Sequence, residues 1–149
     1  DPKFIIRRMI RFASEDIGNA DPQALQLAIA AKQSVEFLGY PECNTALVQT
    51  AIYLAQAPKS NKVYEAVNLA KKEIKLTGNL PVPLHLRNAE TNLMKEMGYG
   101  KDYKYAHDFE NAKVDQEHLP KELFTKEFYN PTDRGFEKEI KDRIGDTTR

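Results

Sequence analysis

Apolar residues in the first half of the chain recur three to four positions apart, with glycine and proline between the runs. This spacing predicts a helix over 4–17, ended by a Gly-Asn pair. The Asp-Pro pair at 21–22 then predicts the start of a second helix, with the aspartate as N-cap and the proline as first helical residue. This helix is expected to reach residue 38 and to end at the glycine that follows. A third helix, 41–57, is apolar nearly all round, and Ser60 caps a fourth that ends near Gly78.

The periodicity weakens in the second half. Two prolines at 81–83 favour an extended stretch, and a short helix is expected over 88–97, closed by a glycine. Tyrosines and a phenylalanine alternate loosely with charged residues over 99–109, which favours an irregular or weakly stranded segment. The pattern therefore predicts a change from regular helices to irregular chain near residue 98.

A last helix is predicted from Asp133. Glu137 and Lys141 lie four positions apart and are expected to pair on its outer side. The residues expected to face inward are Phe136, Ile140 and Ile144. Together these elements predict an all-α helical bundle in one domain: a helical core over 1–98, and a charged, aromatic-containing arm over 99–149 whose terminal helix packs on the core.

Composition narrows the class of protein. The chain has 149 residues, with 22 Lys and Arg against 22 Asp and Glu, so a globally basic nucleic-acid binder is not indicated. One cysteine cannot form an internal disulfide, and no apolar run approaches membrane-span length. We therefore expect a soluble, cytoplasmic chain. The sequence opens without Met or a leader-like segment, which suggests a piece of a longer protein.

Candidate chemistry is sparse. The glycines stand singly, and neither a P-loop nor a G-x-G-x-x-G motif is present, so we expect no nucleotide site in this chain. His85, His107, His118 and Cys43 lack the spacing of metal ligands, and we expect no metal. The order of His85, His107-Asp108 and Asp133 is superficially similar to HD-type metal-dependent phosphohydrolases. Its central pair, however, lies in a segment without helical period, and a histidine tied to a neighbouring carboxylate or carbonyl explains it more simply.

The first predicted helix carries the best polar cluster. Arg7, Arg8 and Arg11 lie within an arc of about 100° on it. Three guanidinium groups on one face are compatible with DNA phosphates or with an acidic surface of an upstream domain. A solvated face with an Arg11–Glu15 pair is the alternative.

The second and third helices carry more apolar surface than a two-layer bundle of this length needs. Part of it is expected to form a contact between subunits. The alternative, that all of it faces the chain's own core and the arm, stays open at this point. The candidate interface residues are Leu25, Leu27, Ile29, Ala31, Leu47, Val48 and Ile52.

Five uncommon strings, in order and across nearly the whole chain, closely resemble the C-terminal region of the RarA/MgsA family, the replication-associated recombination protein A group that includes the Werner helicase-interacting protein. The strings are LGYPE at 38–42, AIYLAQAPKSN at 51–61, PVPLHLRNA at 81–89, GYGKDYKYAHDF at 98–109 and FYNPTDRGFEKEI at 128–140. One departure is local: Glu-Asn-Ala-Lys at 110–113 stands where a glycine-containing turn followed by an aromatic is expected.

The resemblance implies the all-helical C-terminal region of a clamp-loader-like AAA+ ATPase, where such a domain serves as an oligomerisation collar in a homotetramer. It also implies a full-length parent with DNA-stimulated ATPase activity in replication, recombination and repair at stalled forks. DNA, single-stranded DNA-binding protein and further copies of the chain would be its partners. ATP and Mg²⁺ would bind in an N-terminal module outside this sequence. No catalytic residue of the family maps onto this chain, which is therefore expected to do no chemistry itself.

Overall fold

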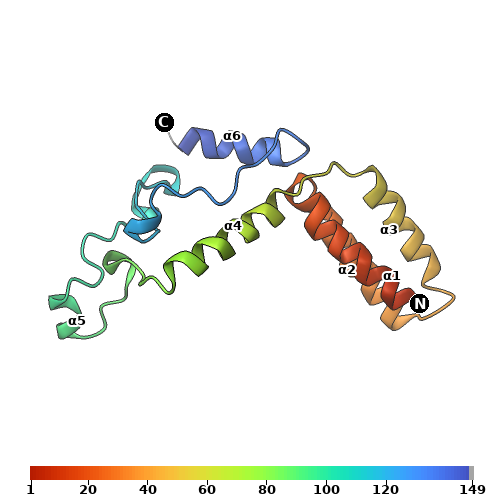
Figure 1. The fold of residues 1–149 in the computed structure, drawn as a ribbon, viewed down its shortest axis with the longest axis horizontal. Coiled ribbons are helices and arrows are strands. Elements are labelled where there is room, and N and C mark those ends of the chain that lie inside the picture. The colour runs from red at the N-terminus through yellow and green to blue at the C-terminus, as the bar shows by residue number, and fades with distance from the viewer. Residues whose placement is uncertain (148–149) are drawn as a thin grey trace. The chain divides into compact units, whose positions relative to one another are not determined.

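The computed structural model describes residues 1–147. All regular secondary structure in these residues is helical (Figure 1), which confirms the predicted all-α class. The α-helices of this part of the chain are α1 Pro2–Phe12, α2 Gln23–Phe37, α3 Asn44–Gln56, α4 Lys62–Thr77, α5 Asn92–Glu96 and α6 Glu137–Thr147. Short 3-10 turns account for most of the other regular backbone.

The described chain forms two compact units. Unit 1 consists of residues 1–71 together with the described residues from 128 onward, and unit 2 consists of Lys72–Glu127. This division differs from the boundary predicted at residue 98. It differs because the chain leaves unit 1 in the middle of α4 and returns to it only at Phe128. The start of α6 lies against the 3-10 turn Gly18–Ala20 of unit 1, since the Phe136 amide just before α6 donates to the Ala20 carbonyl at 2.8 Å.

Local signals set most helix ends. The Asp21 carboxylate accepts from the Gln23 amide at 3.1 Å at the start of α2. The Ser60 hydroxyl accepts from the Lys62 amide at 3.3 Å at the start of α4. The third helix begins at Asn44 rather than at residue 41, because a turn comes first, in which the Cys43 amide bonds the Gly39 carbonyl at 2.9 Å.

The first predicted helix is not uniform. After Phe12 it continues as a π-helical turn, Ala13–Ile17, and it ends at Gly18 with φ +54°. A Cβ atom on Gly18 would approach the Ser60 carbonyl oxygen to 2.9 Å. Glycine is needed here for both backbone conformation and space, because the end of this helix packs directly on the start of α4.

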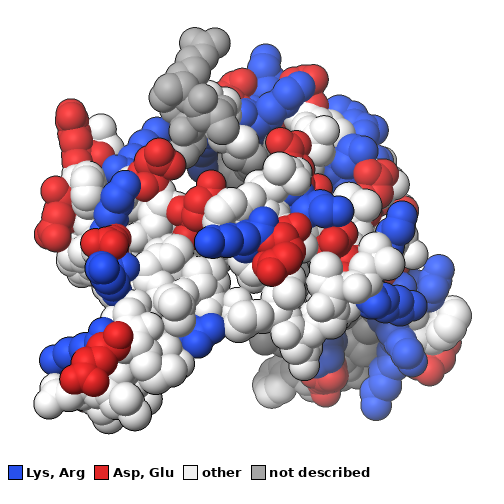
Figure 2. Space-filling model, turned by 60° about the vertical axis from the view of Figure 1, so that its left-hand side comes forward, with Lys and Arg blue, Asp and Glu red and all other residues white. Residues whose placement is uncertain are grey.

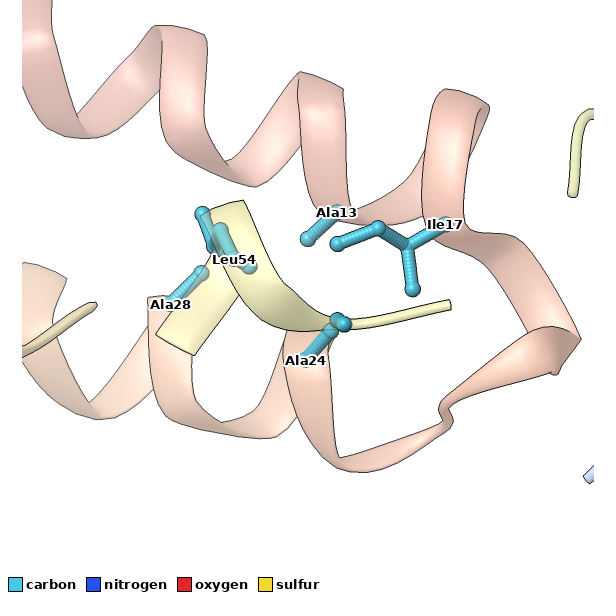
Figure 3. Close-up of a cluster of buried hydrophobic side chains, with 6 residues drawn as sticks. Ala13, Ile17, Ala24, Ala28 and Leu54 are labelled. Carbon is cyan, nitrogen blue, oxygen red and sulfur yellow. The ribbon is translucent and has the colours of Figure 1, made fainter. Parts of the chain in front are cut away.

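Small side chains build the core of unit 1. In one cluster (Figure 3) side chains from the end of the first helix, from α2 and from α3 point toward one another. Its buried members are Ala13, Ile17, Ala24, Ala28, Leu54 and Ala57. A second cluster lies further along the same helices and contains Ile6, Ala31, Val35, Cys43 and Leu47. Alanine along α2 lets the neighbouring helices approach closely, so the core is thin and tightly packed.

Unit 2 has a different character. None of the residues of Lys72–Glu127 is buried, and the chain there is mostly short turns and irregular backbone. The helix predicted over 88–97 contracts to α5, because Thr91 caps it by accepting from the Met94 amide at 3.2 Å. The segment after it is irregular, as predicted. The loop at 110–113 has left-handed backbone at Asn111, φ +56°, and Ala112, φ +52°, where a glycine would be less strained.

The final helix corrects one prediction. It begins at Glu137 rather than at Asp133. Glu137 is fully buried instead of facing out, and Lys141 pairs with Asp133 at 2.9 Å instead of with Glu137. Ile144, expected to face inward, is 45% exposed. The helix is therefore rotated relative to its predicted orientation, with a carboxylate on its inner side.

Candidate functional site

The most prominent surface feature of unit 1 is apolar. Leu25 and Ile29 of α2 are 39% and 40% exposed, and Val48 and Ile52 of α3 are 58% and 56% exposed. Each pair is spaced four residues apart, so each lies along one face of its helix. The two side chains on α3 line a shallow hollow with Asn44, Thr45 and Gln49. These four aliphatic side chains are called the apolar faces below.

The other candidate interface residues lie deeper. Leu27 is half-buried, whereas Ala31 and Leu47 are buried in the second core cluster of unit 1. Placing Ala31 and Leu47 at a subunit contact therefore needs correction, because they lie on the sides of α2 and α3 that pack within the chain. Apolar periodicity alone does not distinguish the inner side of such a helix from the outer side.

A further apolar site escaped the sequence analysis. At the turn between α2 and α3, Phe37 is 90% exposed, Leu38 53% and Tyr40 73%. Three large apolar side chains around a single glycine are unusual for a solvated turn, where polar residues dominate. That composition is the signal that would have identified the turn as a candidate contact site.

The basic face of α1 is accessible. Arg7, Arg8 and Arg11 are all exposed, and Arg11 forms the expected ion pair with Glu15. The arginines of α1 are not fully separated from its isoleucines. Arg7 and Arg11 line the same cavity as Ile6 and Ile10, whereas Arg8 lies outside it.

Charge on the molecule is otherwise mixed. Figure 2 shows Lys and Arg side chains interspersed with Asp and Glu over the visible face. Helix α1 departs from this pattern, since Pro2–Phe12 carries one lysine and three arginines and no acidic residue. A local basic surface therefore exists in a chain of zero formal net charge.

A buried carboxylate fastens the C-terminal segment to unit 1. Glu137 accepts hydrogen bonds from the Ser60 hydroxyl at 2.7 Å, from the Thr132 amide at 2.9 Å and hydroxyl at 2.7 Å, and from the Tyr129 hydroxyl at 2.9 Å. Burial by itself would raise the pKa of Glu137, but these bonds stabilise the charged form and hold the pKa below its ordinary value. With both oxygens engaged by the chain itself, Glu137 is a structural anchor rather than a general base.

Two of the histidines contact other parts of the chain. The Nε2 atom of His85 lies 2.7 Å from the Glu117 carbonyl oxygen, and the His107 ring packs on Tyr105 with centroids 5.1 Å apart. Within residues 1–147, no three His, Cys, Asp or Glu side chains come together as metal ligands. Within unit 2, the structure does not bring His85, His107 and Asp108 of the HD-type alternative together as a ligand group.

Among the helices of residues 1–147, none combines the length and the apolar character needed to cross a membrane.

Comparison with known proteins gives a consistent family. Residues 1–148 match the family model described as "MgsA AAA+ ATPase C terminal". The chain is 52% identical over 147 residues to a Coxiella burnetii protein named replication-associated recombination protein A, and 47% identical over 145 residues to the Escherichia coli K12 protein of that name. Each alignment covers 97% of this chain and 33% or 32% of the relative. A Dictyostelium discoideum protein named ATPase WRNIP1 is 48% identical over 130 residues, 87% of this chain and 15% of its own length.

The chain thus spans about a third of the length of the bacterial relatives. The match runs across both structural units, and the all-helical fold agrees with the fold expected from the five sequence strings. The chain belongs to the family of MgsA AAA+ ATPase C-terminal regions.

Proposed function

We propose that this chain holds together the subunits of a clamp-loader-like AAA+ ATPase and does no chemistry itself. The parent would act in DNA replication, recombination and repair at stalled forks, in keeping with the names of its relatives. ATP and Mg²⁺ would bind to the parent outside this chain. The partners would be further copies of the chain, in a homotetramer, with DNA and single-stranded DNA-binding protein contacting the parent.

The apolar faces carry this proposal. Leu25, Ile29, Val48 and Ile52 lie on regular helices whose inner sides are fixed by the core of unit 1, so the faces are rigid and need no ordering before they bind. Because these side chains are about half exposed, burying the rest of each would contribute about 1 kcal/mol. In a symmetric contact the same patch is buried on both subunits, so each residue contributes twice to the free energy of association.

Clustering of subunits suits an AAA+ ATPase, because such an ATP site is completed by a neighbouring subunit. A C-terminal region that binds copies of itself raises the effective concentration of the attached ATPase modules. ATP hydrolysis would then depend on the assembly that this chain provides, although no residue of the chain would lie in the ATP site. The absence of a transferable catalytic motif in the sequence agrees with that role.

The oligomeric state tests the proposal. Light scattering coupled to size-exclusion chromatography, over a dilution series, is expected to give the mass of four chains, falling toward one chain on dilution. Combined Val48→Asp and Ile52→Asp substitutions place two charges on the apolar face of α3 and should give a monomer. Asn61→Asp with Asn68→Asp adds the same charge at exposed polar positions, one just before α4 and one within it, that belong to neither apolar face, and it should leave the assembly intact. A wild-type chain that stays monomeric at every concentration would refute the proposal.

The basic surface of α1 supports a second candidate, a DNA-binding module that uses Arg7, Arg8 and Arg11. Replacing all three with Ala should lower both the affinity for DNA and the dependence of that affinity on salt, because fewer phosphates would be neutralised. Fluorescence anisotropy at several salt concentrations measures both. Binding that is absent, or that does not respond to salt, would reject this candidate.

A further inference from the structure

A hydrophobic groove with a basic rim runs between α1 and α2, which lie side by side in unit 1 (Figure 1). Its volume is about 330 Å³. The apolar part of its lining is Ile6, Ile10 and Val35. Ile6 and Val35 are 3% and 6% exposed and belong to the second core cluster, so the floor is held rigidly by the core. A groove of this size is preformed for one or two bulky apolar side chains.

The rim of the groove is predominantly cationic. Lys3, Arg7, Arg11 and Lys32 line it, against one acidic residue, Glu36. Two of these cations already have partners on the chain, because Arg11 pairs with Glu15 and Lys32 pairs with Glu36 at 3.0 Å. Within residues 1–147, the Lys3 ammonium and the Arg7 guanidinium form no ion pair. The groove therefore presents two unsatisfied positive charges on the α1 side of an apolar floor.

We propose that this groove binds an acidic segment of another protein in which a bulky aliphatic or aromatic side chain stands next to carboxylates. The apolar side chain would bury itself on Ile6, Ile10 and Val35, and the carboxylates would pair with Lys3 and Arg7. Each half of the ligand matches one half of the site, and the planar guanidinium of Arg7 gives its contact with a carboxylate directional specificity.

The apolar floor favours such a segment over duplex DNA as the occupant. The phosphates of a duplex would satisfy Lys3 and Arg7, but its sugar-phosphate backbone offers no apolar group for the floor. It would also use Arg8 as readily as Arg7, since both are exposed on α1. The position of Arg8 outside the groove thus provides an internal control. The site is separate from the proposed subunit contact, because neither apolar face contributes a lining residue.

The proposal is tested with a short fluorescent peptide that alternates aspartate and leucine, measured by anisotropy against the whole chain. Two matched peptides dissect the ligand: one replaces leucine with serine and keeps the charge, and the other replaces aspartate with asparagine and keeps the apolar groups. We expect the first peptide to bind, and each matched peptide to bind at least about tenfold more weakly.

Charge-reversal variants dissect the protein. Arg7→Glu is expected to weaken binding of the acidic peptide about tenfold or more, whereas Arg8→Glu, the same change on the same helix, should alter it less than about twofold. Equal losses in the two variants, or equal binding of the serine peptide, would overturn the proposal in favour of general charge attraction.

Two further measurements identify any other occupant. Peptide binding by the monomeric Val48→Asp, Ile52→Asp variant, with none by the assembled wild-type chain, would show that a second copy fills the groove. The other measurement uses single-stranded DNA as a competitor. If it displaces the peptide, and if Arg8→Glu lowers the affinity for this DNA as much as Arg7→Glu does, the groove is part of a phosphate-binding surface instead. Either result, like the absence of peptide binding to the wild-type chain, contradicts the proposal. Failure of this proposal would leave the oligomeric state of the chain, and hence the proposed function, untouched.

Discussion

Units 1 and 2 show two different ways of ordering one chain. In unit 1 a stripe of alanines on α2 packs against α1 and α3, and two clusters of buried side chains result. In unit 2 none of the residues of Lys72–Glu127 is buried, and large apolar residues such as Leu93 and Tyr105 are more than half exposed. Hydrophobic burial therefore stabilises the first unit much more than the second.

Polar contacts hold unit 2 instead. The Arg87 side chain donates to the Val82 carbonyl at 2.7 Å and to the Tyr99 hydroxyl at 3.1 Å, and its guanidinium lies 5.1 Å from the Tyr99 ring centroid. Lys104 donates to the Asp115 carbonyl at 2.8 Å. Contacts of this kind contribute about 0.5–1.5 kcal/mol each, and less where water competes. Unit 2 should accordingly open locally at a lower free energy than unit 1 unfolds.

The largest contrast is expected from truncating one apolar residue in each unit. Ile17→Ala removes a fully buried side chain from the core of unit 1 and should lower the free energy of unfolding by about 4 kcal/mol. Leu93→Ala, at a residue 65% exposed in unit 2, should change it by less than about 0.5 kcal/mol. Urea denaturation followed by circular dichroism measures both. Similar losses would mean that unit 2 has a core of its own.

The next effect concerns the carboxylate that anchors α6 in unit 1. Glu137→Gln keeps the shape but replaces charge-assisted hydrogen bonds, so we expect a loss of about 2 kcal/mol near neutral pH. The exposed Glu139→Gln is the matched control, with an expected change below about 0.5 kcal/mol. Urea denaturation at neutral pH measures both variants, and equal losses would mean that the buried carboxylate is no anchor.

The pH dependence of stability follows from the direction of the Glu137 shift. Because its pKa is lower in the folded chain than the ordinary 4.5, the unfolded chain binds the proton more tightly. The stabilisation is complete above pH 4.5 and is lost as the pH falls through the folded-state pKa. The wild-type and Gln variants should thus converge in acid. A constant difference between their unfolding free energies across that range would show that Glu137 acts without its charge.

The smallest effect is a gain in unit 2. Ala112 has φ +52°, a conformation that costs a residue with a Cβ about 1–2 kcal/mol. Ala112→Gly should remove that strain and, after the entropy cost of glycine, stabilise the loop by about 0.5–1 kcal/mol. Amide hydrogen exchange over residues 105–113 is the measurement. Ala106→Gly, in the neighbouring 3-10 turn, should speed exchange, and faster exchange in both variants would contradict the assignment of strain.

Local signals in the sequence were sufficient for most of the helices. The Asp-Pro pair before α2, the cap at Ser60 and the glycines after α2 and α4 act within a few residues of where they stand, so reading them needs no knowledge of the fold. Each of these features depends on contacts inside one helix or one turn.

The errors occurred where distant parts of the chain meet. Glu137 looked like an outward-facing partner of Lys141, because its actual partner Ser60 is 77 positions away. Ala31 and Leu47 looked like interface residues, because periodicity does not say which neighbour covers which side. The groove between α1 and α2 was missed, because its apolar floor depends on Val35 from α2 as well as on residues of α1. Tertiary contacts, not local propensity, decided all three.

One ion pair of unit 2 bears on how this region could be shortened. Lys126 and Glu73, 3.1 Å apart, lie close to the two points where the chain enters and leaves unit 2. The two stems of this unit therefore lie close together, so the segment between them has the arrangement of an insertion. A few glycines and serines bridging its stems would leave α1, α2, α3 and the anchored α6 connected in their native order.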